Sequence, residues 1–263
     1  MQDFLNGKKF SDLTDEQKSD FFKYEIGVVE LDLDNDDPRV KEMFKKVNRT
    51  SNSLTAIEKL SSEYGATEYM ITAKVLADQI QKIQSEDEYI GSDLYVDPEI
   101  DSQMLTWVKS VSAKHYRKLI YESNIFDARE INRKIPLMYT LNLMSTYLGG
   151  FFKRNELTLR FLDDYSFNFE DKDRIVELID KSAKLYLDLR FNKKSIFNQK
   201  SNFFSLMICL MERNADINLS ETKNNLIEFE KNIPEDYLLA SREGVNNKRE
   251  REIRDGYIRP LVV

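Results

Sequence analysis

The sequence predicts a mainly α-helical protein, in which a helical bundle is preceded by a small α/β segment. Beyond residue 50, apolar side chains recur at the three- and four-residue spacing of helices with one buried face. The chain has only 8 Gly and 5 Pro, too few for the frequent turns of a β-sandwich. Only residues 24–31 have the composition of a strand. We therefore divide the chain into an α/β part, residues 1–50, and a helical domain, residues 51–263.

The first part has one clear helix start and one strand. Thr14 is a suitable N-cap, and Gln17 three residues later completes a capping box. Residues 24–31 place apolar side chains on both faces, as a buried strand does. A lone strand is not stable in water, and no downstream segment is of comparable quality to pair with it.

Helix signals then continue to the end of the chain. Pro38 suits the first turn of a helix, and Thr55 with Glu58 forms a second capping box. One strongly apolar helix over residues 135–148 ends at Gly149-Gly150, and Pro234 interrupts a later one. The apolar stripes that predict the remaining helices begin at Met70, Met104, Leu157, Ile175, Phe203 and Leu226.

The net charge, the single cysteine and the lack of long apolar runs argue against several classes of function. The net charge of -7 argues against nucleic-acid binding over the whole surface, although a local basic patch remains open. The single cysteine, Cys209, lies in an apolar run, which indicates a buried residue and excludes an internal disulfide. No apolar run reaches the roughly 20 residues that span a bilayer, and no signal-peptide pattern is present. We expect a cytoplasmic protein with no membrane partner.

Catalytic and metal-binding patterns are scarce. His115 is the only histidine, so a nucleophile–histidine pair or a zinc site lacks partners, and we interpret His115 as structural. Gly149-Gly150 is not followed by the Lys-Ser/Thr of a phosphate-binding loop. Acidic residues cluster at 32–37 and at Asp163-Asp164, where solvated loops are the simpler interpretation than a divalent-cation site. We assign no catalytic residue and no metal ligand.

The first 60 residues carry a set of short motifs. They are Phe4-Leu5-Asn6-Gly7-Lys8, Phe10, Asp12-Leu13, Phe22, Tyr24-Glu25-Ile26, Val28-Val29, Val40, the run from Met43 to Arg49, Leu54-Thr55 and Glu58. Within the run, Phe44 to Asn48 forms a Phe-x-x-x-Asn element, which Leu-Thr and an acidic residue follow. In these motifs the chain resembles the GmrSD restriction endonuclease N-terminal domain family, also called domain of unknown function 262. The later helices resemble that family more loosely.

The resemblance implies a ParB/sulfiredoxin-like α/β domain at the start, followed by helices. It also implies a place in type IV, modification-dependent restriction, where this half is linked to hydrolysis of a nucleoside triphosphate with Mg and to sensing modified phage DNA. The family's Asp-Gly-Gln-Gln-Arg motif normally precedes the Phe-Leu-Asn-Gly segment, a point that Met1 almost occupies. We therefore expect the later portion of such a protein, binding no cofactor and catalytically silent alone.

The resemblance assigns a nucleotide-binding role, in the completed family site, to Phe44, Asn48 and Arg49. Phe44 and Asn48 are four residues apart and share one helix face, where the amide of Asn48 can both donate and accept. Arg49 could contact a phosphate through two hydrogen bonds. The alternative is that Asn48 only ends its helix.

The C-terminal stretch is charged. Its basic residues Arg242, Lys248, Arg249, Arg251 and Arg254 are candidates for contact with a DNA backbone. Interleaved glutamates favour the alternative of a solvated helix with surface ion pairs.

Three hypotheses follow for the function. The chain is a helical scaffold or DNA-sensing portion of a restriction protein, with DNA or a nuclease subunit as partner. Alternatively, it is one subunit of a split enzyme, which an upstream chain completes for nucleotide hydrolysis. In the third hypothesis it is a protein-interaction or inhibitor subunit without response to nucleotide or DNA.

Overall fold

The computed structural model describes residues 10–23, 25, 28, 30, 34, 37–47, 54–77, 99–123, 125–213 and 217–263. The chain forms two compact units, Met1–Ser53 and Leu54–Val263. The described residues are mainly helical and include no strand, which confirms the predicted helical class. Within the predicted strand, Glu25, Val28 and Glu30 have no regular structure and the other residues lie outside the described part. The ParB/sulfiredoxin-like α/β remnant therefore stays a prediction.

The first unit contains helices α1 (Asp15–Phe22) and α2 (Pro38–Val47). The predicted capping box of α1 is confirmed: the amide of Gln17 donates to Thr14 Oγ1 at 3.3 Å, and the amide of Thr14 donates to Gln17 Oε1 at 3.0 Å. This reciprocal pair satisfies two amides that a helix start otherwise leaves unbonded. The first helical residue of α2 is proline, as expected.

Three aromatic rings gather at one end of α1. Phe10, Phe21 and Phe22 contact one another edge to face, with ring centroids 5.3 to 6.1 Å apart. All three side chains nevertheless remain exposed, because no other described part of the first unit covers them.

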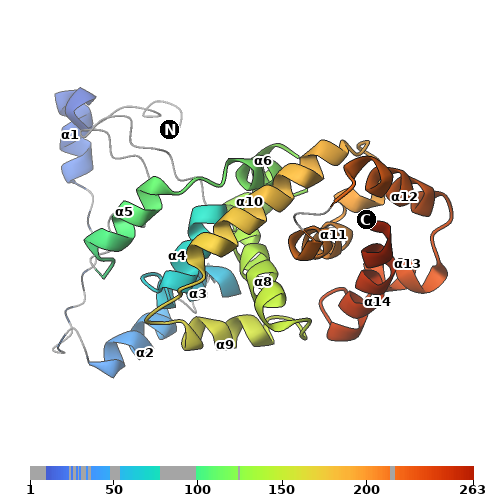
Figure 1. The fold of residues 1–263 in the computed structure, drawn as a ribbon. Coiled ribbons are helices and arrows are strands. Elements are labelled where there is room, and N and C mark those ends of the chain that lie inside the picture. Colours follow the sequence, from blue (N-terminus) through green and yellow to red (C-terminus); the bar gives the residue numbers. More distant parts are fainter. Residues whose placement is uncertain are drawn as a thin grey trace. The chain divides into compact units, whose positions relative to one another are not determined.

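The second unit is a helical bundle (Figure 1). Its helices are α3 (Ala56–Glu63), α4 (Glu68–Ala77), α5 (Ser102–Ser110), α6 (Lys114–Glu122), α7 (Ala128–Asn132), α8 (Ile135–Gly149), α9 (Glu156–Asp164), α10 (Lys172–Leu189), α11 (Lys200–Arg213), α12 (Leu219–Lys231), α13 (Glu235–Arg242) and α14 (Lys248–Ile258), with short 3-10 turns η4 (Ile196–Asn198) and η5 (Arg259–Leu261). No helix of the described residues is both long and apolar enough to cross a membrane.

Helices α8 and α10 organise the core. α8 packs against α3, α4, α7, α9 and α11, and α10 packs against α4, α6, α11 and α12. α8 is apolar on nearly all sides, which is typical of a helix surrounded by others. As predicted, it ends at the glycine pair, and Gly150 has φ +80°, a conformation that glycine adopts without strain.

The C-terminal helices form one end of the bundle. α13 and α14 pack against each other, and both contact α11 (Figure 1). Pro234 precedes α13 and divides it from α12, so the interrupted helix expected from the sequence is two separate helices. This end of the second unit carries the charged residues of the C-terminal stretch.

Candidate nucleic-acid surface

The residues assigned to the nucleotide site belong to the first unit. Phe44 is part of α2, but its side chain lies outside the described part of the structure. α2 ends at Val47, and Asn48 and Arg49 are also outside the described residues. The nucleotide-binding assignment therefore stays a prediction.

His115 has a structural role. It lies at the start of α6, where Asp180 of α10 accepts hydrogen bonds from the amides of His115 at 2.7 Å and Tyr116 at 3.0 Å. The other Asp180 oxygen is 2.8 Å from His115 Nδ1. Ala113, the N-cap residue, has no side-chain oxygen, so an aspartate from another helix caps α6 instead. The imidazole thus connects two helices and has no nucleophile among these partners.

The thiol and the acidic pair also have structural partners. Cys209 is buried, as predicted, and burial raises the pKa of its thiol well above the usual value. Asp163 accepts a 2.5 Å hydrogen bond from the hydroxyl of Tyr64. In the part of the chain that the structure describes, no group of His, Cys, Asp and Glu is arranged to hold a metal ion.

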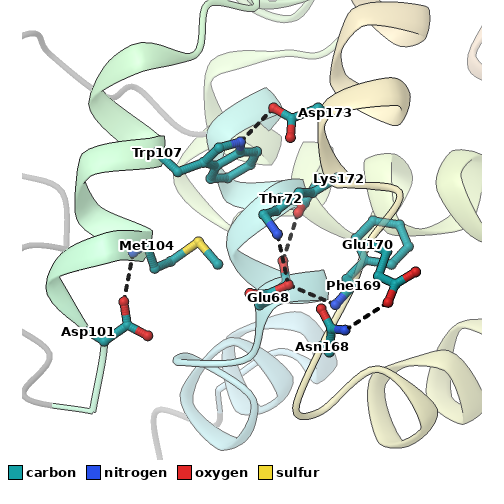
Figure 2. A network of polar contacts seen from close by, with 10 residues as sticks. All are labelled: Glu68, Thr72, Asp101, Met104, Trp107, Asn168, Phe169, Glu170, Lys172 and Asp173. Carbon is teal, nitrogen blue, oxygen red and sulfur yellow. Dashed lines mark hydrogen bonds and ion pairs between the residues drawn. The ribbon is translucent and has the colours of Figure 1, made fainter.

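A polar network joins α4, α5 and the start of α10 (Figure 2). Glu68 Oε2 accepts hydrogen bonds from the amide of Phe169 at 2.7 Å and from Lys172 Nζ at 3.2 Å. The indole nitrogen of Trp107 donates to Asp173 Oδ1 at 2.7 Å. These contacts link elements that are far apart in sequence, so the network holds helices together rather than forming a reactive centre.

The charged C-terminal stretch divides into exposed and buried residues. Arg242, Lys248 and Arg249 are exposed, as contact with a DNA backbone requires. Arg251 and Arg254 are 3% and 1% exposed, so the prediction that they contact DNA is wrong. They lie three residues apart on α14 and share the face that packs into the bundle. The solvated-helix alternative is therefore wrong for this face of α14.

Arg254 bonds to three parts of the bundle. Its Nε donates to Ser205 Oγ at 3.2 Å, and its terminal nitrogens donate to the carbonyls of Ala240 at 2.5 Å and Val245 at 2.8 Å. The guanidinium has fixed, divergent donors, which suits a residue that joins α11, α13 and the following turn.

Arg251 lies between two aromatic rings. Its guanidinium carbon is 4.8 Å from the ring centroid of Phe152 and 4.9 Å from that of Phe204. Its terminal nitrogens donate to the carbonyls of Phe152 at 3.4 Å and Arg154 at 3.3 Å. A planar cation stacks favourably on aromatic faces, and Arg251 thereby fixes the segment between α8 and α9 against α14.

The two buried arginines have no hydrogen-bonded carboxylate partner among the described residues. Within the described ranges neither donates a hydrogen bond to a carboxylate or forms an ion pair with one, but the charge of Glu250 acts to raise the pKa of Arg254, and Glu250 Oε2 is buried without a hydrogen-bond partner. Burial, and then the neighbouring charge of Arg254, lowers the pKa of Arg251 to about 10. Burial likewise lowers the pKa of Arg254. Both remain cations at neutral pH and add positive potential to this end of the bundle.

Two loops meet above these arginines. The amide of Arg154, between α8 and α9, donates to the carbonyl of Asn246, between α13 and α14, at 2.6 Å. Arg154 has φ +52°, which a residue with a side chain rarely adopts and which therefore stores strain. Gly244 in the second loop has φ +56°, where glycine is unstrained. The first loop, with Lys153 and Arg154, therefore adjoins a loop about 90 positions further along the chain.

We call the exposed cations in the first loop and at the two helix ends beside the second loop the two-loop basic surface. It comprises Lys153, Arg154, Arg242, Lys248 and Arg249, all exposed. Lys248 is also 3.8 Å from Glu252, an exposed pair that contributes little to stability and leaves the lysine accessible to other anions. Exposed Glu243 and Glu252 lie among these cations. The surface can still attract an extended anion, because its cations are spread over one loop and two helix ends instead of converging on one point.

Three of these five cations are predicted from the charged C-terminal stretch, whereas Lys153 and Arg154 are not. A weak signal was present, since the pair follows the helix-ending Gly149-Gly150 and so belongs to an exposed loop. Nothing in the sequence indicates that this loop adjoins the C-terminal one.

The chain was also compared with protein-family models, curated proteins and solved structures, and none of them matches it.

Proposed function

We propose that this chain is the helical, DNA-sensing portion of a modification-dependent restriction protein in a phage-defence system, and that the two-loop basic surface contacts the DNA backbone. The resemblance of the first 60 residues to the GmrSD N-terminal domain family supports the restriction context. The surface supports the contact with DNA, because lysine and arginine side chains that neutralise phosphates provide most of the sequence-independent affinity for nucleic acid.

One observation carries the proposal. The 2.6 Å hydrogen bond between Arg154 and Asn246 places Lys153 and Arg154 beside the loop that leads to Lys248 and Arg249. The buried Arg251 and Arg254 donate to carbonyls of these two loops, at Arg154 and Val245. In a chain of net charge -7, cations outnumber the neighbouring carboxylates of Glu243, Glu250 and Glu252 here, as a protein needs when it binds DNA with one face only.

The test is binding of a fluorescently labelled duplex, measured by anisotropy with the full chain. The variant Lys153→Ala/Arg154→Asn removes two cations, and asparagine tolerates the left-handed conformation of residue 154. We expect its affinity to fall about tenfold, which corresponds to about 1.4 kcal/mol for two lost phosphate contacts. The matched control Lys181→Ala/Lys184→Ala removes two exposed cations of α10 and should bind like the unchanged protein.

Equal losses of duplex affinity in the variant and the control would show that only the net charge of the protein matters. The two-loop basic surface would then not be the DNA contact. A second duplex that carries 5-hydroxymethylcytosine tests modification sensing. Tighter binding to the modified duplex supports a sensing role, and equal affinity for both duplexes would reduce the proposal to backbone binding.

A further inference from the structure

The loop that carries Lys153 and Arg154 is anchored at both ends, by the buried Phe152 ring and by Asn155, which accepts a 3.0 Å hydrogen bond from Asn142. Besides the hydrogen bond from the Arg154 amide to Asn246, the carbonyls of Phe152 and Arg154 accept hydrogen bonds from Arg251, whose guanidinium also stacks on the Phe152 ring. Arg251 therefore contacts this loop from below, while Lys153 and Arg154 stay exposed above it.

We infer that Arg251 is a positioning residue of the two-loop basic surface. Its buried guanidinium holds the loop with Lys153 and Arg154 against the loop that leads to Lys248 and Arg249, so that both loops reach the same phosphate backbone. This inference rests on the proposed function, since it concerns how that surface is kept in shape. Arg251 itself is 3% exposed and does not touch DNA.

Stability alone does not account for an arginine in this place. Removing a guanidinium from water is costly, and Arg251 recovers the cost only through two long hydrogen bonds and two aromatic rings, without a carboxylate. Apolar side chains of similar volume commonly replace such buried charges without loss of stability. Arginine instead provides geometry: its planar group fits between Phe152 and Phe204 while two of its nitrogens reach two carbonyls of one loop.

The strained backbone of Arg154 indicates the same role. Its φ of +52° orients its amide toward Asn246 and its carbonyl toward Arg251, so both polar groups of this residue join the loop to the C-terminal end of the bundle. A strained conformation persists only where its surroundings hold it. Without Arg251 we expect the residue to relax and the two loops to separate.

A double-mutant cycle tests this coupling. Arg251→Met is measured in the unchanged protein and in the Lys153→Ala/Arg154→Asn background, with duplex affinity from anisotropy and folding from circular dichroism. In the unchanged protein we expect about fivefold weaker binding, within the usual size of coupling between contacting residues. In the background that already lacks both cations, we expect Arg251→Met to weaken binding by less than about twofold, because Arg251 then has no cations left to position.

Arg251→Lys separates geometry from charge. Lysine keeps the positive charge but lacks the planar group, so we expect it to lose as much affinity as methionine does. Full affinity of Arg251→Lys would overturn the inference, because charge and not geometry would then be what the surface needs. If Arg251→Met fails to fold, the cycle is carried out with Arg251→Lys alone.

An equal loss of affinity in both backgrounds would also overturn the inference, because Arg251 would then act on folding in general. Failure of the proposed function looks different. In that case Lys153→Ala/Arg154→Asn binds the duplex like the unchanged protein, and the role of Arg251 falls with it.

Discussion

Asp180 caps a helix to which it does not belong: its carboxylate on α10 accepts hydrogen bonds from the amides of His115 and Tyr116 at the start of α6. The same carboxylate reaches the imidazole of His115 at 2.8 Å. One side chain thus joins two of the helices that pack most extensively in the bundle, and it gives the only histidine a structural partner.

Asp180→Ala should therefore destabilise the protein. It leaves two amides at a helix start without partners, and a lost cap of this kind costs about 1 to 2 kcal/mol of unfolding free energy. Urea denaturation followed by circular dichroism measures the change. Asp188→Ala is the matched control, since Asp188 is exposed on the same helix and should change stability by less than about 0.5 kcal/mol. Similar losses in both variants would contradict the capping role.

The single tryptophan, Trp107, reports on the attachment of α5. The buried residues of α5, Met104 and Val108, belong to a small cluster with Ile71, Val75 and Ile100, while the partly buried Trp107 also packs against the main core. A small cluster stabilises its helix less than a large core does, so α5 should detach first as denaturant rises. We expect the fluorescence transition of Trp107 at lower urea than the loss of helix by circular dichroism. Coincident transitions would show that α5 unfolds with the core.

Stability should fall at alkaline pH. The hydroxyl of Tyr64 donates to Asp163, and this hydrogen bond raises the pKa of Tyr64 to about 12. An unfolded tyrosine loses its proton near pH 10. Between these values the unfolded state binds fewer protons than the folded one, so the unfolding free energy decreases as pH rises.

The variant Tyr64→Phe isolates this contribution. Its unfolding free energy should be lower than that of the unchanged protein below about pH 10, and the difference should shrink toward pH 12. Urea denaturation at a series of pH values measures it. A difference that stays constant across this range would mean that Tyr64 does not titrate as its contact with Asp163 implies.

Local signals in the sequence predicted much of the fold. Both capping boxes, Thr14 with Gln17 and Thr55 with Glu58, are present in the structure, because each depends on residues three positions apart. The helix end at Gly149 was also predicted, since glycine acts through its own backbone. Such features do not need knowledge of distant residues.

Contacts across the fold could not be predicted in the same way. The cap that Asp180 provides to α6 joins residues 65 positions apart, and no local pattern indicates it. The buried face of α14 could not be predicted for a related reason: alternating charges indicate a solvated helix, but Arg251 and Arg254 form hydrogen bonds with carbonyls of other segments. Burial of an arginine depends on such acceptors, which only the folded chain brings together.

The salt dependence of DNA binding tests the two-loop basic surface most directly. Between about 50 and 200 mM salt, the logarithm of the association constant should fall linearly with the logarithm of salt concentration, by about 0.9 for each phosphate contact. We predict that Lys153→Ala/Arg154→Asn makes this slope shallower by about 1.8, while Lys181→Ala/Lys184→Ala leaves it unchanged. A slope that is the same in all three proteins, or no binding of the duplex at low salt, would contradict the account.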